Sequence, residues 1–214
     1  MLKLWGRRSS SNVQAVMWCI AELGLECERI DAGLSYGIVD TDEYLMMNPN
    51  GTVPTLQDGD NPYLWESGAI LRYLVNAYSI DIFWPNDPIE RANVDRWAEW
   101  AKINIALKFT APVFWKVVRT APSKQDPEAI AAALQTLDKQ LDIAEAQLSM
   151  THYLAGPELT LADIQFGHCL YRYFDIDIYR KERPVLEAYY KSLTQRQAYR
   201  EHVMVSYEEL REFD

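Results

Sequence analysis

Residues 9–12, three serines and an asparagine, carry short polar side chains at the expected start of a helix. Apolar residues at helical spacing follow from Val13 to Leu23, and Gly24 predicts the helix end. Free backbone N–H groups and the positive end of the helix dipole favour an anion at such a start. The serines could alternatively serve only as helix caps.

A second candidate site lies at residues 47–56, which read Met-Asn-Pro-Asn-Gly-Thr-Val-Pro-Thr-Leu. Pro54 cannot donate to a β-ladder, so Val53-Pro54 at a strand entry predicts an edge, a bulge or a cis turn. A cis bond would leave the N–H and C=O of Val53 free to pair with an extended peptide. The alternative is an ordinary turn at 48–51 followed by a routine strand.

Composition limits the other kinds of chemistry. Lys and Arg number 21 against 31 Asp and Glu, and the net charge of −10 disfavours nucleic acid and anionic membrane surfaces as partners. The three cysteines and three histidines show no metal-ligand spacing, so we expect no metal and reduced, buried thiols. No signal peptide or membrane-spanning stretch is visible, which predicts a cytoplasmic protein.

The elements that must position these residues predict a fold class of α/β plus all-α. The βαβ then ββα order, with the first two strands parallel, is that of a thioredoxin-like domain over residues 1–80. We predict strands at 2–5, 27–30, 55–57 and 63–65, and helices at 13–23 and from Glu66-Ser67 onward.

The rest of the chain predicts helix. Residues 81–88 are the predicted linker, and residues 89–214 the all-helical domain. Pro112 predicts a kink or break, and Thr160 with Asp163 has the pattern of a capping box. Residues 203–214 show no pattern that assigns them an element. We predict helices at about 90–118, 127–148, 161–174, 184–193 and 195–202.

With these elements in order, the chain resembles the cytosolic glutathione S-transferases, in particular a bacterial serine-type group near the theta, zeta and beta classes. The resemblance covers essentially the whole chain. Each motif is weak alone, but their order and spacing indicate the family's fold and glutathione binding. The motifs are GRRSSSNVQAVMW at 6–18, ELGL at 22–25, NPNGTVPTL at 48–56, LWESGAILRYL at 64–74 and LTLADI at 159–164.

The resemblance implies that glutathione is the co-substrate. Val53-Pro54 would pair with the cysteinyl unit, and Glu66-Ser67 would hold the γ-glutamyl end, where an acid and a hydroxyl complement an ammonium and a carboxylate. Thr52 stands where many relatives carry a basic residue. The contact to the glycyl carboxylate would then come from Arg7, Arg8 or another basic residue.

The resemblance also assigns catalysis to the serine run. Alignment of Val16 with a valine of the theta and zeta classes places the active serine at Ser10, with Ser11 next and Ser9 third. The hydroxyl would donate a hydrogen bond to the glutathione sulfur and lower the thiol pKa toward neutrality. Asn12 would assist the sulfur or cap the helix.

The resemblance places an electrophile pocket between the first domain and the first long helix. The predicted activity is conjugation of glutathione to a small-molecule electrophile by a homodimer. Glutathione-dependent reduction of peroxides or disulfides and a non-catalytic ligand carrier are the alternatives. For the aromatic residues, core packing is the alternative to substrate contact. The available lining is Trp97, Trp100, Asn104, Lys108, Phe114, Trp115 and Arg119.

Overall fold

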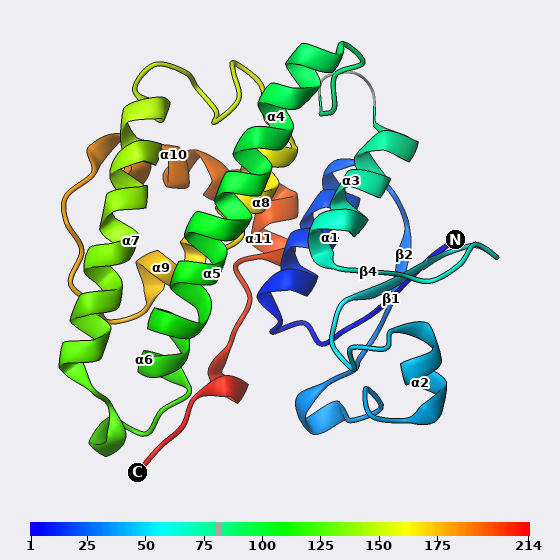
Figure 1. The fold of residues 1–214 in the computed structure, drawn as a ribbon, viewed down its shortest axis with the longest axis horizontal. Helices are drawn as coiled ribbons and strands as arrows, with labels where there is room; N and C mark the ends of the chain where they lie inside the picture. Colours follow the sequence, from blue (N-terminus) through cyan, green and yellow to red (C-terminus); the bar gives the residue numbers. More distant parts are fainter. Residues whose placement is uncertain (80–82) are drawn as a thin grey trace.

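The computed structural model describes residues 1–79 and 83–214, which form a small sheet with helices and a larger helical part beside it (Figure 1). The predicted linker at 81–88 lies partly outside these residues, so the domain boundary stays a prediction. None of the helices described is long and apolar enough to cross a membrane.

The sheet confirms the predicted βαβ-ββα plan. Its strands β1 and β2 are parallel, and β3 pairs antiparallel with both β1 and β4. Leu4 lies opposite Leu56 at the fully buried centre of the sheet. The strands are β1 (Leu2–Trp5), β2 (Cys27–Ile30), β3 (Thr55–Asp58) and β4 (Leu64–Trp65), in the order β2-β1-β3-β4.

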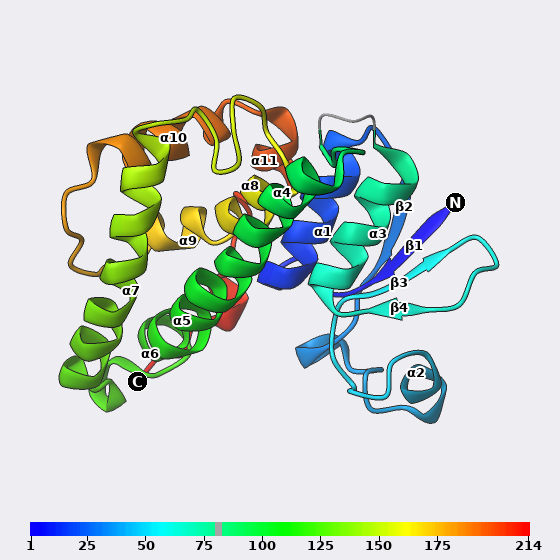
Figure 2. The ribbon, with the colours of Figure 1, turned by 45° about the horizontal axis from the view of Figure 1, so that its top comes forward.

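Helices α1 (Ser11–Glu22) and α3 (Ser67–Tyr78) lie on the face of the sheet turned toward the helical part, while α2 (Asp42–Met47) lies on the other side (Figure 2). A 3₁₀ turn at Leu34–Tyr36 precedes α2. Because α1 also packs against α8 (Leu161–Gly167) and α11 (Gln197–His202) of the helical part, residues on several of its sides are buried, Trp18 among them.

The first long helix runs from Pro88 to Val118 without a break. The Asp87 side chain caps this helix, whose start at Pro88 lies two residues before the predicted start at about residue 90. Pro112 lies in a π-helical turn, whose wider ring accommodates a residue that has no N–H to donate. The segments are α4 (Pro88–Ala101), a π turn (Lys102–Ala106), α5 (Leu107–Phe109), a second π turn (Thr110–Trp115) and α6 (Lys116–Val118).

The predicted continuous helix at 161–174 is wrong. The chain forms α8 (Leu161–Gly167) and α9 (Leu170–Asp175), because the Gly167 carbonyl accepts a hydrogen bond from the Tyr199 hydroxyl at 2.9 Å. The other predicted helices are present. They are α7 (Pro127–Leu148), α10 (Pro184–Thr194) and α11 (Gln197–His202), with 3₁₀ turns at Pro122–Lys124 and Glu208–Leu210.

The predicted capping box at the start of α8 is confirmed. The Asp163 carboxylate is fully buried and accepts from the Thr160 N–H at 2.9 Å and the Thr160 hydroxyl at 3.1 Å. It also accepts from the Leu154 N–H at 3.0 Å and the Tyr189 hydroxyl at 2.8 Å. One carboxylate therefore joins α8, α10 and the loop before α8.

Candidate functional site

The loop that carries Val53 is fixed from beneath by two buried side chains. The Val53–Pro54 peptide bond is cis, one of the three arrangements that the sequence left open. The Thr52 carbonyl accepts hydrogen bonds from the Tyr44 hydroxyl at 2.7 Å and from the Asn48 amide at 2.9 Å. Within the part of the chain that the structure describes, the backbone N–H and C=O of Val53 have no partner. A short piece of peptide edge is therefore open for pairing.

The three serines have different surroundings. The Ser9 hydroxyl donates to the carboxylate of Glu209, far along the chain. Ser10 is the N-cap residue of α1 and is 7% exposed, and no group among the described residues bonds to its hydroxyl. Ser11 is the first residue of α1. Ser10 thus lies at the positive end of the helix dipole with a hydroxyl free to donate.

Asn12 and Ser67 meet in a short hydrogen-bonded array. The Ser67 hydroxyl donates to the Asn12 side-chain oxygen at 3.2 Å and accepts from the Lys102 ammonium at 2.8 Å. Glu66 lies beside them at the N-cap position of α3 with a φ of 70°, and its side chain makes no capping bond. The array brings together hydroxyl, amide and ammonium groups next to an exposed carboxylate.

Sequence reasoning missed Lys102. Burial lowers the pKa of Lys102, although the nearby Glu66 carboxylate acts in the opposite direction. Ala98 and Ile105 lie four residues before and three after it on the helix, and both are buried. That spacing could have identified a lysine on the buried face.

A cleft of about 360 Å³ joins the predicted catalytic residues to the carboxy-terminal part. Residues 7, 9–12 and 51–53 line one side. Thr110, Trp115, Arg119, Arg172 and Leu210 line the other. The cleft therefore lies where the electrophile pocket was predicted.

Five of the seven predicted pocket residues lie outside the lining of this cleft. The Trp97 ring packs edge-on against Trp100 at 5.2 Å, and Trp100 contacts Phe166, so both tryptophans are partly buried and pack against the core. Lys108 donates to Asn104 at 2.8 Å instead of reaching the cleft. These positions point in different directions around the helix axis, so one face of the long helix cannot present all of them to one cleft.

Trp115 and Arg119 are the predicted pocket residues that do line the cleft. They lie four residues apart on one helical face, and the Arg119 guanidinium covers the Trp115 ring at 4.9 Å from its centre. Trp115 is 44% exposed, which is high for so large an aromatic residue. Phe114, also a candidate, is fully buried behind the wall.

The segment 203–214, which the sequence left unassigned, completes this wall. It runs back from α11 past α5 and α6, in red in Figure 1, and the Glu212 N–H donates to the Val118 carbonyl at 2.9 Å. Leu210 lines the cleft, and the Tyr207 ring packs edge-on against Phe114 at 5.1 Å. No sequence signal could have shown this, because the contacts join residues far apart in the sequence.

Arg172 holds these parts together. It is 3% exposed, donates to the Ser9 carbonyl and lies over the Phe114 ring at 4.6 Å. Burial lowers the pKa of Arg172 to about 10, so it remains a cation at neutral pH. It fixes the serine loop against the helical part.

The cysteines are poor candidates for the nucleophile. All three are unpaired, and the cleft lining includes none of them. Burial raises the pKa of Cys27 to about 11 and that of Cys169 to about 12, and it also raises the pKa of Cys19. Thiols with raised pKa values are unreactive at neutral pH. Among the residues described, no group of three or more His, Cys, Asp or Glu could hold a metal ion.

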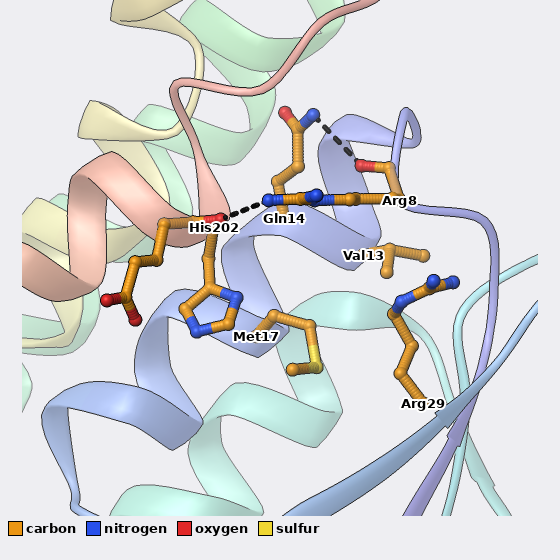
Figure 3. Close-up of a pocket in the computed structure, with 7 residues that line it drawn as sticks. Arg8, Val13, Gln14, Met17, Arg29 and His202 are labelled. Carbon is orange, nitrogen blue, oxygen red and sulfur yellow. Dashed lines mark hydrogen bonds between the residues drawn. The ribbon is translucent and has the colours of Figure 1, made fainter.

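A second pocket, of about 410 Å³, lies between α1, β2 and α11 (Figure 3). Its two arginines have protein partners. Arg8 points toward His202 and donates to the Glu201 carbonyl at 3.0 Å. Arg29 pairs with Asp31 and donates to the Gly6 carbonyl at 2.7 Å. Both arginines of this pocket therefore already have oxygen partners within the protein.

Comparison with known proteins agrees with this architecture. Residues 1–76 match the N-terminal domain of glutathione S-transferases, and residues 106–197 match their C-terminal domain. The chain is 35% identical over 206 residues to glutathione S-transferase GstB of Escherichia coli strain K12, covering 96% of this chain and 99% of the relative. It is 32% identical to glutathione S-transferase F13 of Arabidopsis thaliana, covering 92% and 93%.

A solved structure is similar as well. It is the theta class glutathione S-transferase of the citrus canker pathogen Xanthomonas axonopodis pv. citri with glutathione bound, with a TM-score of 0.90 and 42% identity over 96% of this chain and 98% of that one. The chain belongs to the glutathione S-transferase family. It is an enzyme with the family's thioredoxin-like domain and all-helical domain.

Proposed function

We propose that this transferase binds glutathione along the cleft wall formed by Val53 and the start of α1, and activates its sulfur with the Ser10 hydroxyl. The observation that carries the proposal is the unpaired Ser10 hydroxyl at a helix N-terminus, in the same cleft as the open backbone of Val53. The Xanthomonas relative with glutathione bound supports this choice of co-substrate.

The γ-glutamyl end would lie at the array of Ser67, Lys102 and Glu66. Lys102 and the N-terminus of α3 offer positive charge to the α-carboxylate, and the Glu66 carboxylate offers a partner for the ammonium. Asn12 is bonded to Ser67, so we assign it a positioning role between the two ends of the site.

The chemistry requires no protein base. The Ser10 hydroxyl donates a hydrogen bond to the sulfur, which stabilises the thiolate and lowers the thiol pKa, while the thiol proton leaves to water. The thiolate then forms a carbon–sulfur bond with a small electrophile, which either accepts the electron pair by addition or releases a leaving group. Ser11 lines the same cleft and is the alternative donor.

Titration of the thiolate absorbance of bound glutathione tests the assignment. We expect the wild type to ionise bound glutathione well below its free value, and Ser10→Ala to raise that pKa by about one unit or more, which is about 1.4 kcal/mol. Ser11→Ala serves as the matched control. A shift in Ser11→Ala alone would move the role to Ser11, and no shift in the wild type would refute activation altogether.

Product analysis separates transfer from reduction. A thioether conjugate supports the transferase chemistry proposed here, whereas oxidised glutathione as the main product would replace it with peroxide or disulfide reduction. The readout is the mass of the glutathione product formed from an electrophile and from a peroxide, each with wild-type enzyme.

We also propose a cytoplasmic homodimer. Trp65, in the outer strand β4, and Tyr63, just before it, are 37% and 38% exposed, and Leu107 is 60% exposed on the first long helix. Exposed aromatic and aliphatic residues of this kind favour association. The unpaired cysteines suit a reducing compartment. Light scattering would give twice the chain mass, and a mass of one chain would refute the dimer.

A further inference from the structure

Arg7 and Arg119 differ from the other arginines of this chain. Throughout residues 1–79 and 83–214, every other arginine donates a hydrogen bond to another residue. In the same part of the chain, neither the Arg7 nor the Arg119 guanidinium makes a hydrogen bond or an ion pair. The Nε of Arg7 is buried without a partner, and Arg119 covers only the ring of Trp115.

The two free guanidiniums belong to one cleft and repel each other. Burial lowers the pKa of Arg7, and the charge of Arg119 lowers it further, while the Glu209 carboxylate acts in the opposite direction. Arg172 adds a third positive charge to the lining. The described lining residues include no carboxylate, in a chain with a net charge of −10. A positive cleft in an acidic protein is suited to a bound anion.

The pocket in Figure 3 provides a comparison within the same molecule. It also holds two arginines, but both donate to protein oxygens. An arginine that serves only the fold is expected to find such partners, because an unpaired buried donor is costly. The absence of protein partners at Arg7 and Arg119 therefore indicates that their partner is a ligand.

We propose that Arg7 and Arg119 together bind an anionic group carried by the electrophile, a carboxylate or an equivalent oxyanion, so that this transferase favours acidic electrophiles. The planar guanidinium matches a carboxylate in two parallel hydrogen bonds. This inference rests on the proposed function, because it assigns the substrate class of the same cleft.

The position of Arg119 argues for the electrophile over glutathione as the source of the anion. Arg119 belongs to the wall contributed by the helical part, beside Trp115. Under the proposed function, the γ-glutamyl carboxylate has Lys102 as its cation. The glycyl carboxylate of glutathione is the competing occupant of the arginine pair, and the experiment must separate the two sources.

Calorimetry on the full chain saturated with S-methylglutathione tests the proposal without turnover. The probes are 3,5-dinitrobenzoate and 3,5-dinitrobenzamide, which share a ring and differ in charge. We expect the benzoate to bind about tenfold more tightly or better. Equal affinity, or no benzoate binding, overturns the proposal. A benzoate preference that appears only without S-methylglutathione also overturns it, because the arginines then serve the glycyl carboxylate.

Matched variants locate the preference. Arg119→Gln and Arg7→Gln should each bring the two probes to within about twofold of each other, and Arg119→Lys should retain part of the preference. Arg8→Gln is the control, because Arg8 neighbours Arg7 in sequence but bonds to Glu201 in the other pocket. A full preference in both Gln variants overturns the proposal.

A reactive pair separates this inference from the proposed function. With 4-chloro-3,5-dinitrobenzoate or its amide, the glutathione thiolate forms the carbon–sulfur bond, chloride leaves with the electron pair, and the thiol proton passes to water. We expect both thioethers, with the larger kcat/KM for the benzoate. A benzoate preference in binding without any thioether would refute the proposed function and leave the anion site standing. Thioether formation without a benzoate preference would support the proposed function and refute the anion site.

Discussion

Substitution of Lys102 by methionine should weaken glutathione binding and leave the stability of the fold nearly unchanged. Methionine keeps most of the length of the side chain and removes the ammonium. Lys102 donates to Ser67 at 2.8 Å, at the point where the α-carboxylate of glutathione is proposed to lie. The variant therefore removes one charge-assisted hydrogen bond from the bound state.

The expected loss in binding follows from that bond. A hydrogen bond to a charged group contributes about 1.5–3 kcal/mol. A loss of about 2 kcal/mol corresponds to roughly a thirtyfold increase in Kd. The effect on folding is smaller because two terms oppose each other. Burial lowers the pKa of Lys102, so the folded state bears the protonated ammonium at a cost at neutral pH, and the bond to Ser67 offsets that cost. We expect the free energy of unfolding to change by less than about 1 kcal/mol.

Calorimetric titration with glutathione and urea denaturation measure the two quantities. Lys108→Met is the matched control, because Lys108 lies on the same helix and donates to Asn104 outside the cleft lining. It should leave the Kd for glutathione unchanged. An unchanged Kd in Lys102→Met, together with a clear loss of stability, would show that Lys102 only ties the two parts of the chain together, and the reasoning would be refuted.

Three further predictions concern the framework of the site. Asp163→Asn should lower the free energy of unfolding, measured by urea denaturation, by about 1–3 kcal/mol. The Thr160 and Tyr189 hydroxyls can reorient toward the new amide, but one of the two backbone N–H groups that bond to Asp163 would face the amide NH₂. Gly167→Ala should lower the melting temperature, at a cost of about 1–3 kcal/mol, because a Cβ there would lie 2.9 Å from the Trp18 ring. The Lys181 ammonium, with a second basic partner, lowers the pKa of Asp142. Asp142→Asn should therefore lower the free energy of unfolding by less than about 1 kcal/mol above pH ~3.9. As the pH falls through the lowered pKa, the unfolding free energies of the variant and the wild type should converge. Unfolding curves that differ equally at all pH values would contradict this.

The sequence predicted those parts of the site whose signals are local. The capping box at Thr160 is set by residue types a few positions apart, and the structure confirms it. At Val53–Pro54 the sequence left an edge, a bulge or a cis turn open, and the structure has the cis bond. The periodicity of α1 and α3 located the helix starts that carry Ser10 and Ser67. Each of these features depends on neighbours within about one helical turn or one hairpin.

The lining of the cleft was predicted less well, because it depends on which side of a long helix meets the other parts of the chain. Trp97 and Asn104 have residue types suited to a pocket, yet only Trp115 and Arg119 of the predicted set reach it. Periodicity gives the spacing of a helical face but not its partner. Lys102, in contrast, was not predicted and belongs to the site, because its role appears only when α3 places Ser67 beside it.

The sequence by itself therefore determined the two-domain plan and the helix starts, and it limited the turn at Val53–Pro54 to a few arrangements, because local sterics and hydrogen bonding select them. Only the tertiary structure decided that Glu209 bonds to Ser9, that Arg172 fixes the serine loop, and that Arg7 and Arg119 share one cleft. These contacts join residues far apart in the sequence, and they form only after packing of the hydrophobic core has set the positions of the helices.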